Sequence, residues 1–173
     1  MQAMSQWLVR TFAYAPPAGE YPAIVERLRG TPARVEAAVR YVPEPILTAR
    51  AGDAWSAQEN IGHLLDLEPL WLARAREILA GAKELSAADM SNGRTYAAGH
   101  NARSVVAIGA ELRVARNNLV ALLDGVTDAD VSRGALHPRL RRPMRLIDLC
   151  FFVAEHDDHH LAIVTRLLAG ATR

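Results

Sequence analysis

Apolar residues recur at intervals of three or four positions through most of this chain, and strict alternation of apolar and polar residues hardly occurs. A spacing of three or four positions places the apolar side chains on one face of an α-helix, whereas alternation would indicate strands. The pattern predicts a short opening helix over about 21–29. Four longer helices are predicted over about 31–41, 55–80, 101–123 and 144–168. We therefore expect an all-α fold, an antiparallel four-helix bundle in a single domain over residues 1–173.

Capping residues set the predicted helix ends. Gly30 would end the short helix, and Thr31 and Pro32 would begin the next one as N-cap and first helical residue. Ser56 and Glu59 have the spacing of a capping box, in which each side chain accepts a hydrogen bond from the backbone N–H of the other. Polar connections are expected over 46–54, 82–98 and 127–143.

The composition is that of an ordinary globular protein, with 50% hydrophobic and 23% charged residues among 173. A net charge of +1 and a pI near 8.0 produce no strong field toward nucleic acid or an anionic membrane. No signal peptide is evident over 1–11, and the apolar run over 149–154 is too short to cross a bilayer. Cys150 is the single cysteine, which suits a reducing compartment. We therefore expect a cytoplasmic protein with neither nucleic acid nor a membrane as partner.

Three of the six histidines, His63, His156 and His160, fall on apolar helix faces. Successive helical side chains are about 100° apart, so His156 and His160 are separated by about 40° on one stripe. The large apolar residues of that stripe are Leu149, Phe152, Val153, Ile163 and Leu167. Imidazole is the side chain most often recruited as a transition-metal ligand. Three rings meeting in a bundle core would form an open metal site, whereas a lone histidine on an apolar face is more often a hydrogen-bonded core residue than a ligand.

The polar neighbours of these histidines have less certain roles. His159 lies at the flank of the stripe, where it could be an alternative ligand, a general base, a residue of the pocket wall or an exposed side chain. Asp157 and Asp158 point away from the stripe and are expected to be solvated. Glu59 and Asp66 lie within one turn of the first histidine and could accept the second N–H of a ligand ring. A helix cap and an exposed charge are the alternatives for these two.

His100 and His137 fall in or beside predicted loops and have no companion ligands nearby in the sequence. His137 precedes a basic run that could hold an anionic group or could be a solvated loop. The run consists of Arg139, Arg141, Arg142 and Arg145. Cys150 projects away from the histidine pair, so packing is its expected role.

Two motifs about ninety residues apart stand out. They read Trp55-Ser56-x-x-Glu59-x-x-x-His63 and His156-x-x-His159-His160-Leu161. Together they resemble the motifs of the DinB-like superfamily of bacterial proteins, and the resemblance extends over nearly the whole chain. It implies up-down-down-up connectivity and often a homodimer. It also implies a divalent metal, zinc or nickel, held by three histidines that correspond to His63, His156 and His160.

Relatives in the resembled superfamily include transferases or isomerases that use bacillithiol, mycothiol or glutathione, and others described as metal-dependent hydrolases. Three neutral ligands would leave an ion with open positions, where it lowers the pKa of a bound water or thiol. The leading hypothesis is a metal-dependent transferase that adds a low-molecular-weight thiol cosubstrate to a small electrophilic substrate. The alternatives are a hydrolase using metal-bound water and a non-catalytic, stress-associated module stabilised by its ion. The sequence assigns no catalytic residue beyond the ligands.

Overall fold

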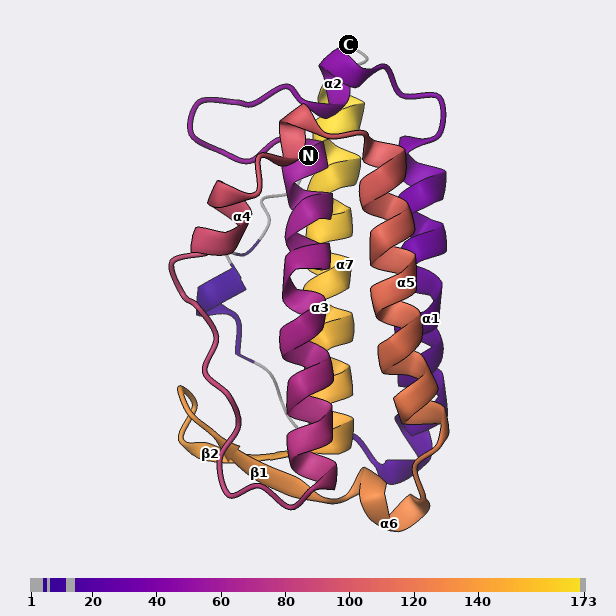
Figure 1. Ribbon diagram of the computed structural model, residues 1–173, viewed down its shortest axis with the longest axis vertical. Coiled ribbons are helices and arrows are strands. Elements are labelled where there is room, and N and C mark those ends of the chain that lie inside the picture. The colour runs from indigo at the N-terminus through magenta and orange to yellow at the C-terminus, as the bar shows by residue number, and fades with distance from the viewer. Residues whose placement is uncertain (1–4, 6, 12–14, 172–173) are drawn as a thin grey trace.

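Four long helices run side by side in the computed structural model, which describes residues 5, 7–11 and 15–171 (Figure 1). They are α1 (Tyr21–Val39), α3 (Ala57–Leu79), α5 (Val105–Asp124) and α7 (Leu146–Ala171). Helices α1 and α3 each pack against both α5 and α7. The four helices therefore enclose one core, with α1 and α3 on one diagonal, and the predicted four-helix bundle is confirmed.

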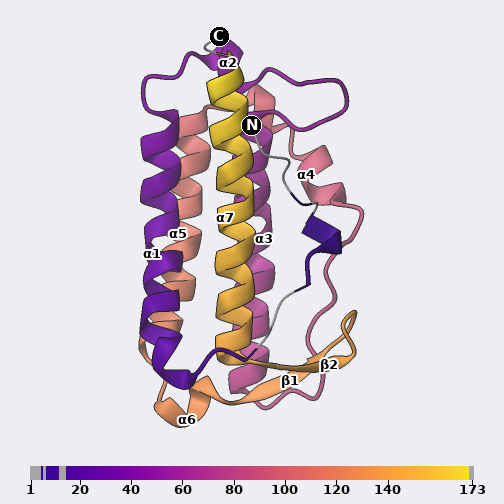
Figure 2. The ribbon, with the colours of Figure 1, turned by 180° about the vertical axis from the view of Figure 1, so that it is seen from behind.

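The connectivity is up-down-down-up, as the resemblance implied. Helix α1 runs upward and α3 downward in Figure 1, and the segment over 80–104 then returns along the length of the bundle. Helix α5 consequently runs downward as well, parallel to α3, and α7 runs upward. The returning segment carries α4 (Gly93–Ala97) and the 3-10 turn η3 (His100–Ala102). The view from behind shows this segment and the 3-10 turn η1 (Trp7–Val9) on the same side of α3 (Figure 2).

The prediction of a separate short helix over 21–29 is wrong, because α1 continues through Gly30 and Pro32 without a break. Proline has no N–H to donate to the carbonyl four residues earlier, which is that of Leu28. The guanidinium of Arg116 on α5 supplies the missing donor, with its Nη1 3.0 Å from the Leu28 oxygen. A contact from a different helix thus compensates for the defect on which the predicted break depended.

The all-α fold class holds, but the connection over 127–143, predicted as a polar link, contains a small sheet. Helix α6 (Asp128–Val131) is followed by β1 (Gly134–His137) and β2 (Arg142–Arg145), which pair antiparallel. Gly134 lies opposite Arg145, and a Cβ at Gly134 would lie 2.9 Å from the carbonyl oxygen of Met144. The strands are too short to show an alternating pattern. The remaining short elements are α2 (Glu44–Leu47), η1 (Trp7–Val9) and η2 (Ala18–Glu20).

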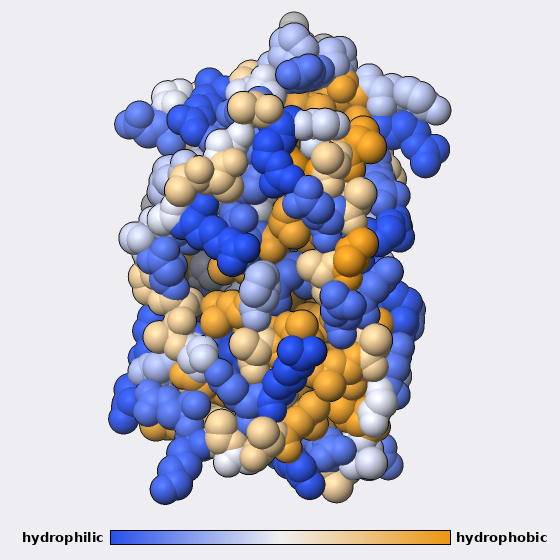
Figure 3. Space-filling model, in the orientation of Figure 1, coloured by the Kyte–Doolittle hydropathy of each residue, from blue (hydrophilic) through white to orange (hydrophobic). Residues whose placement is uncertain are grey.

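Two clusters of buried apolar side chains fill the bundle. One includes Leu28, Trp71 and Ile147 near the sheet, and the other includes Ile61 and Leu112 toward the opposite end. The surface over α3 is mixed, with apolar groups interrupted by charged ones (Figure 3). In the part of the chain that the structure describes, no helix is long and apolar enough to cross a membrane. The functional residues described next lie where the two clusters meet.

Candidate metal site

The structure brings His63 of α3 together with His156 and His160 of the neighbouring antiparallel helix α7. One ring nitrogen from each of the three lies within 4.8 Å of the others. The ring centroids are 4.5 Å apart for His156 and His160, and His63 lies 5.3 Å and 4.8 Å from them. All three rings are buried. The helical projection therefore identified residues that share one place in the core.

Two polar side chains that the sequence did not reveal hold these rings. Nδ1 of His160 lies 2.9 Å from Oδ1 of Asn60, whose amide nitrogen donates to the Ser56 carbonyl at 2.8 Å. The amide oxygen of Asn60 can only accept, so His160 donates from Nδ1 and carries its lone pair on Nε2. Nδ1 of His63 lies 3.0 Å from Oγ1 of Thr95 on α4. Asn60 is one turn before His63 and could have been suspected, but nothing in the sequence pointed to Thr95.

Glu59 and Asp66, the expected acceptors, bind other groups. Glu59 completes the capping box with Ser56, as the pattern predicted, and also forms an ion pair with Arg50. The Arg50 guanidinium lowers the pKa of the Glu59 carboxyl to about 2. Asp66 is buried rather than exposed, and its Oδ2 lies 2.8 Å from Nε2 of His100. Both carboxylates therefore form their hydrogen bonds with groups other than the rings of the triad.

His100, which the sequence left without a companion, fastens the returning segment to α3. Its ring packs directly on Gly62, where an added Cβ would lie 2.2 Å from the ring. Only glycine allows this approach, and Gly62 immediately precedes His63 in the chain. The same segment carries Thr95, so the contact between His100 and Asp66 helps bring the Thr95 hydroxyl to the His63 ring.

Burial keeps the three imidazoles neutral. It lowers the pKa of His63 to about 4 and lowers the pKa values of His156 and His160 well below the ordinary value. Neutral rings present lone pairs, which a metal ion requires. Among the described residues, the buried Nδ1 of His156 has no hydrogen-bond partner. An orphaned ring nitrogen beside two oriented rings fits a site that could hold a divalent transition metal.

A cavity of about 480 Å³ opens beside the triad and is lined by all three rings. Aromatic side chains form much of its wall, and the indole of Trp55 lies 4.8 Å from the His63 ring. The other aromatic residues of the wall are Trp7, Trp71 and Phe152. His159 also lines the cavity, with its ring 5.4 Å from that of His160. The pocket role expected for His159 agrees with this position, and its burial lowers the pKa of its imidazole.

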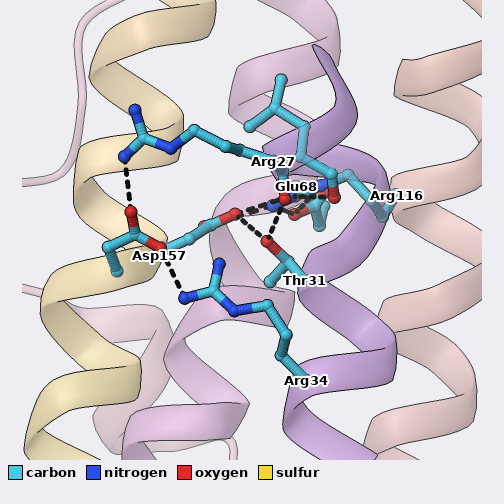
Figure 4. Close-up of polar contacts among 8 residues, drawn as sticks. Arg27, Thr31, Arg34, Glu68, Arg116 and Asp157 are labelled. Atoms are coloured by element: carbon cyan, nitrogen blue, oxygen red, sulfur yellow. Dashed lines mark hydrogen bonds and ion pairs between the residues drawn. The ribbon is translucent and has the colours of Figure 1, made fainter. Parts of the chain in front are cut away.

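Asp157, expected to be solvated, is instead buried beside His156 in a charged network (Figure 4). Its Oδ2 accepts from Nη1 of Arg116 at 2.6 Å and from Oγ1 of Thr31 at 2.8 Å. Nη2 of Arg116 also donates to Oε1 of Glu68 at 2.5 Å. The helical projection placed Asp157 correctly off the histidine stripe, but that side of α7 faces α1 and α5 rather than water.

Asp158 and Glu155 extend the charged contacts of α7 toward the surface. Asp158 pairs with Arg27 at 2.5 Å and with Arg34 at 2.6 Å. Glu155 pairs with Arg27 and with Arg10, each at 2.8 Å. Arginines of α1 and of the N-terminal segment therefore neutralise the acidic side of α7, and the prediction that Asp158 is simply solvated is wrong.

The sequence profile described as the DinB superfamily matches residues 27–164, a range that includes all three histidines. The chain belongs to the DinB superfamily. The resemblance carried by the two histidine motifs is thereby confirmed. No curated protein matches the chain.

Two solved bacterial structures have a similar fold. YfiT from Bacillus subtilis, described as a probable metal-dependent hydrolase with an unusual four-helix bundle topology, matches with a TM-score of 0.82 at 20% identity, over 94% of each chain. A protein from Streptococcus pneumoniae matches with a TM-score of 0.62 at 14% identity, over 94% of this chain and 92% of that one. At these identities the likeness shows the fold alone. A homodimer and the choice between zinc and nickel stay predictions.

Proposed function

We propose that this protein is a metal-dependent hydrolase that acts on a small molecule bound in the cavity beside His63, His156 and His160. The observation that carries the proposal is the meeting of three buried, neutral imidazoles at the wall of a cavity of about 480 Å³. Three neutral ligands with an open side are typical of catalytic rather than structural metal sites. The description of YfiT as a probable metal-dependent hydrolase supports the same choice.

In this proposal the three histidines hold a divalent ion, and Asn60 and Thr95 keep two of the rings in place. Imidazole ligands favour zinc, nickel and similar metals over magnesium and calcium. When bound, such an ion supplies Lewis-acid chemistry, because it lowers the pKa of a water molecule and polarises a carbonyl group. The aromatic side chains of the wall lower the polarity around the triad, which strengthens electrostatic interactions there.

In our proposal, His159 is the residue that moves a proton. Hydrolysis adds water across an ester or amide bond, so one proton must leave the water and one must reach the departing alcohol or amine. The imidazole of His159 lines the cavity, and burial lowers its pKa, so it is neutral near pH 7 and can accept a proton. In our proposal it takes the proton from water and returns it to the leaving group.

Transfer of a thiol, the first expectation from the sequence, stays a prediction. Nothing in the described residues favours a thiol over water as the co-reactant, and the cavity would admit either. A stress-associated module with a purely structural ion likewise stays a prediction. Hydrolysis is proposed because the open triad and the description of YfiT both support it.

Metal content and turnover test the proposal together. We expect the purified protein to contain about one transition-metal ion per chain and to hydrolyse members of a panel of small aryl esters and anilides without added thiol. Chelation should abolish turnover, and adding metal back should restore it. H156A should lose both metal and activity. H159Q should keep the metal while kcat falls by about 10²–10⁴-fold, the usual contribution of a general base.

Two results would contradict the hydrolase, and a third would contradict the role given to His159. Consumption of electrophiles only when a thiol is added would support the transferase instead. Chelation that lowers the melting temperature but changes no turnover would support a structural ion. Normal kcat in H159Q would remove that histidine from the mechanism.

A further inference from the structure

The cavity has a second polar end, away from the histidine triad. Arg74 and His137 line it there, Arg74 from α3 and His137 from the last position of β1. Arg74 follows His63 by eleven residues on one helix. At 1.5 Å per residue, these two positions are about 16 Å apart along the helix axis. The cavity therefore joins two separate groups of polar side chains.

The guanidinium of Arg74 is held firmly at this end. Its Nε and Nη2 donate to the carbonyl oxygen of Ser86 at 2.9 Å and 2.8 Å. The guanidinium carbon lies 5.7 Å from the ring centroid of Trp71. With the side chain fixed by these contacts, Nη1 lies 3.4 Å from Nε2 of His137.

The tautomer of His137 follows from its backbone contacts. Its Nδ1 accepts from the backbone N–H groups of Arg139 and Leu140, each at 3.2 Å. A neutral imidazole that accepts at Nδ1 must carry its proton on Nε2. Nε2–H of His137 and Nη1–H of Arg74 are then two donors side by side, and neither can accept from the other. A ligand acceptor placed between them would be within reach of both N–H groups.

Positive charge gathers around this pair of donors. Burial, together with the nearby charges of Arg74, Arg139 and Arg142, lowers the pKa of His137 to about 4. Asp89 is the acidic residue that lines the same cavity. Its carboxylate accepts hydrogen bonds from the backbone N–H groups of Ser91 and Gly93 in its own loop. The potential at the end of the cavity therefore favours an anion.

We propose that Arg74 and His137 form a subsite for a carboxylate of the substrate. Arginine offers a planar set of donors that suits carboxylate, and the imidazole N–H adds a second direction of approach. The basic run after His137, which the sequence left undecided, contributes Arg139 and Arg142 to the same field. The residues that bind the substrate's carboxylate are thus distinct from those that hold the metal.

The wall between the two ends indicates the rest of the substrate. Leu67 and Trp71 succeed His63 on α3 at helical spacing, and Phe152 faces them from α7, with its ring 5.9 Å from that of Trp71. An apolar or aromatic spacer of roughly 10–16 Å would fill this stretch, given the helical rise. Resting on the proposed hydrolase, the inference names its substrates as esters or amides of apolar molecules that carry a distal carboxylate.

Binding of two matched probes tests the subsite without requiring turnover. We would titrate 4-phenylbutanoate and 4-phenyl-1-butanol, which differ in the carboxylate, into the protein by calorimetry at neutral pH. The titrations would be done on the protein as purified and again after chelation. We expect the acid to bind at least tenfold more tightly than the alcohol in both states. H156A should keep this preference, because the subsite lies away from the triad.

Variants at the subsite separate the two donors from general packing. R74M should bring the acid-to-alcohol preference close to one while leaving the alcohol affinity unchanged. H137N keeps an acceptor near the Nδ1 position and loses the Nε2 donor, so it should also lose the preference. H137Q places an amide N–H near the Nε2 position and should retain it. If R74M fails to fold, as judged by thermal unfolding, the comparison of H137N with H137Q still tests whether the subsite binds the carboxylate.

The proposal fails if the wild-type protein binds both probes equally, or if the preference survives in R74M and H137N. It also fails if the preference disappears on chelation or in H156A, because the acid would then bind at the triad. Retained preference without any ester or amide hydrolysis would overturn the proposed function and leave the carboxylate subsite standing.

Discussion

Asn60 decides which nitrogen the His160 ring offers to the cavity. Its amide nitrogen is engaged by the backbone carbonyl of Ser56, so its oxygen must face the ring and accept from Nδ1. The lone pair is thereby directed to Nε2. The neighbouring ring of His63 is oriented by a hydroxyl, that of Thr95, which can donate or accept. A single amide therefore determines the tautomer of one proposed ligand.

We predict that N60L lowers the affinity for metal by about 10–100-fold, the usual effect of removing a partner of a ligand histidine. The leucine leaves the Nδ1 proton of His160 without an acceptor. Competition with a coloured chelator would measure the affinity. N118L, at an exposed asparagine of α5, is the matched control and should bind metal normally. Equal affinity in N60L and the wild-type protein would show that this amide does not orient the ring.

Among the elements, α3 carries most of the site, and its first turn is unusually well fixed. Ser56 and Glu59 form the capping box, Arg50 binds the Glu59 carboxylate, and Asn60 follows directly. Helix α1 behaves differently, because its continuity through Pro32 depends on Arg116 of another helix. Local signals were therefore sufficient to place the start of α3, but in α1 they predicted a break at Gly30 and Thr31 that the structure does not have.

The cap of α3 should make stability depend on pH. The pKa of Glu59 is about 2 in the folded protein against an ordinary 4.5, because Arg50 favours the charged form. The unfolded chain binds the proton more readily between these values, so this stabilisation is complete above about pH 4.5 and is lost as the pH falls toward 2. E59Q should have a lower free energy of unfolding than the wild-type protein at pH 6, and the gap between the two free energies should narrow below pH 4.5. Urea unfolding across this range would measure the free energy of each protein.

E111Q provides the control for this pH series. Glu111 forms a surface ion pair with Arg103, its side chain being 52% exposed. Exposed pairs contribute about 0–1 kcal/mol, so the substitution should change the free energy of unfolding little at any pH. If the free energies of unfolding of E59Q and the wild-type protein differed by the same amount from pH 6 to pH 3, the role given to the Glu59 charge would be contradicted.

At the scale of the whole molecule, Arg116 joins all four long helices. It stands on α5, donates to the Leu28 carbonyl of α1, and forms buried ion pairs with Glu68 of α3 and Asp157 of α7. Asp157 immediately follows His156, so this network holds α7 at the level of the metal site (Figure 4). Removing one partner from a buried ion pair leaves an uncompensated charge, which is strongly destabilising.

We predict that R116M lowers the free energy of unfolding by about 3–5 kcal/mol, because Glu68 and Asp157 would be left buried without a counterion. Chemical denaturation would measure the loss. The triple variant R116M/E68M/D157L removes every charge of the network and should recover much of the stability. A loss below about 1 kcal/mol in R116M would show that water or another group compensates the two carboxylates.

The sequence alone was enough to predict the bundle and to select His63, His156 and His160. Both predictions rest on local geometry. The helical spacing of apolar residues locates the helices, and a spacing of four residues puts two imidazoles on one helix face. The box formed by Ser56 and Glu59 was visible for the same reason, because its partners are three residues apart.

Only the tertiary structure decided which polar side chains are buried and what they contact. Asp157 lies off the histidine stripe, but whether that side of α7 meets water or another helix depends on how the helices pack. Thr95 reaches the site from the returning segment, and Arg74 meets His137 across 63 positions of the chain. Helical periodicity says nothing about such pairs, because their distance is set by the packing of whole elements rather than by the spacing of residues along one of them.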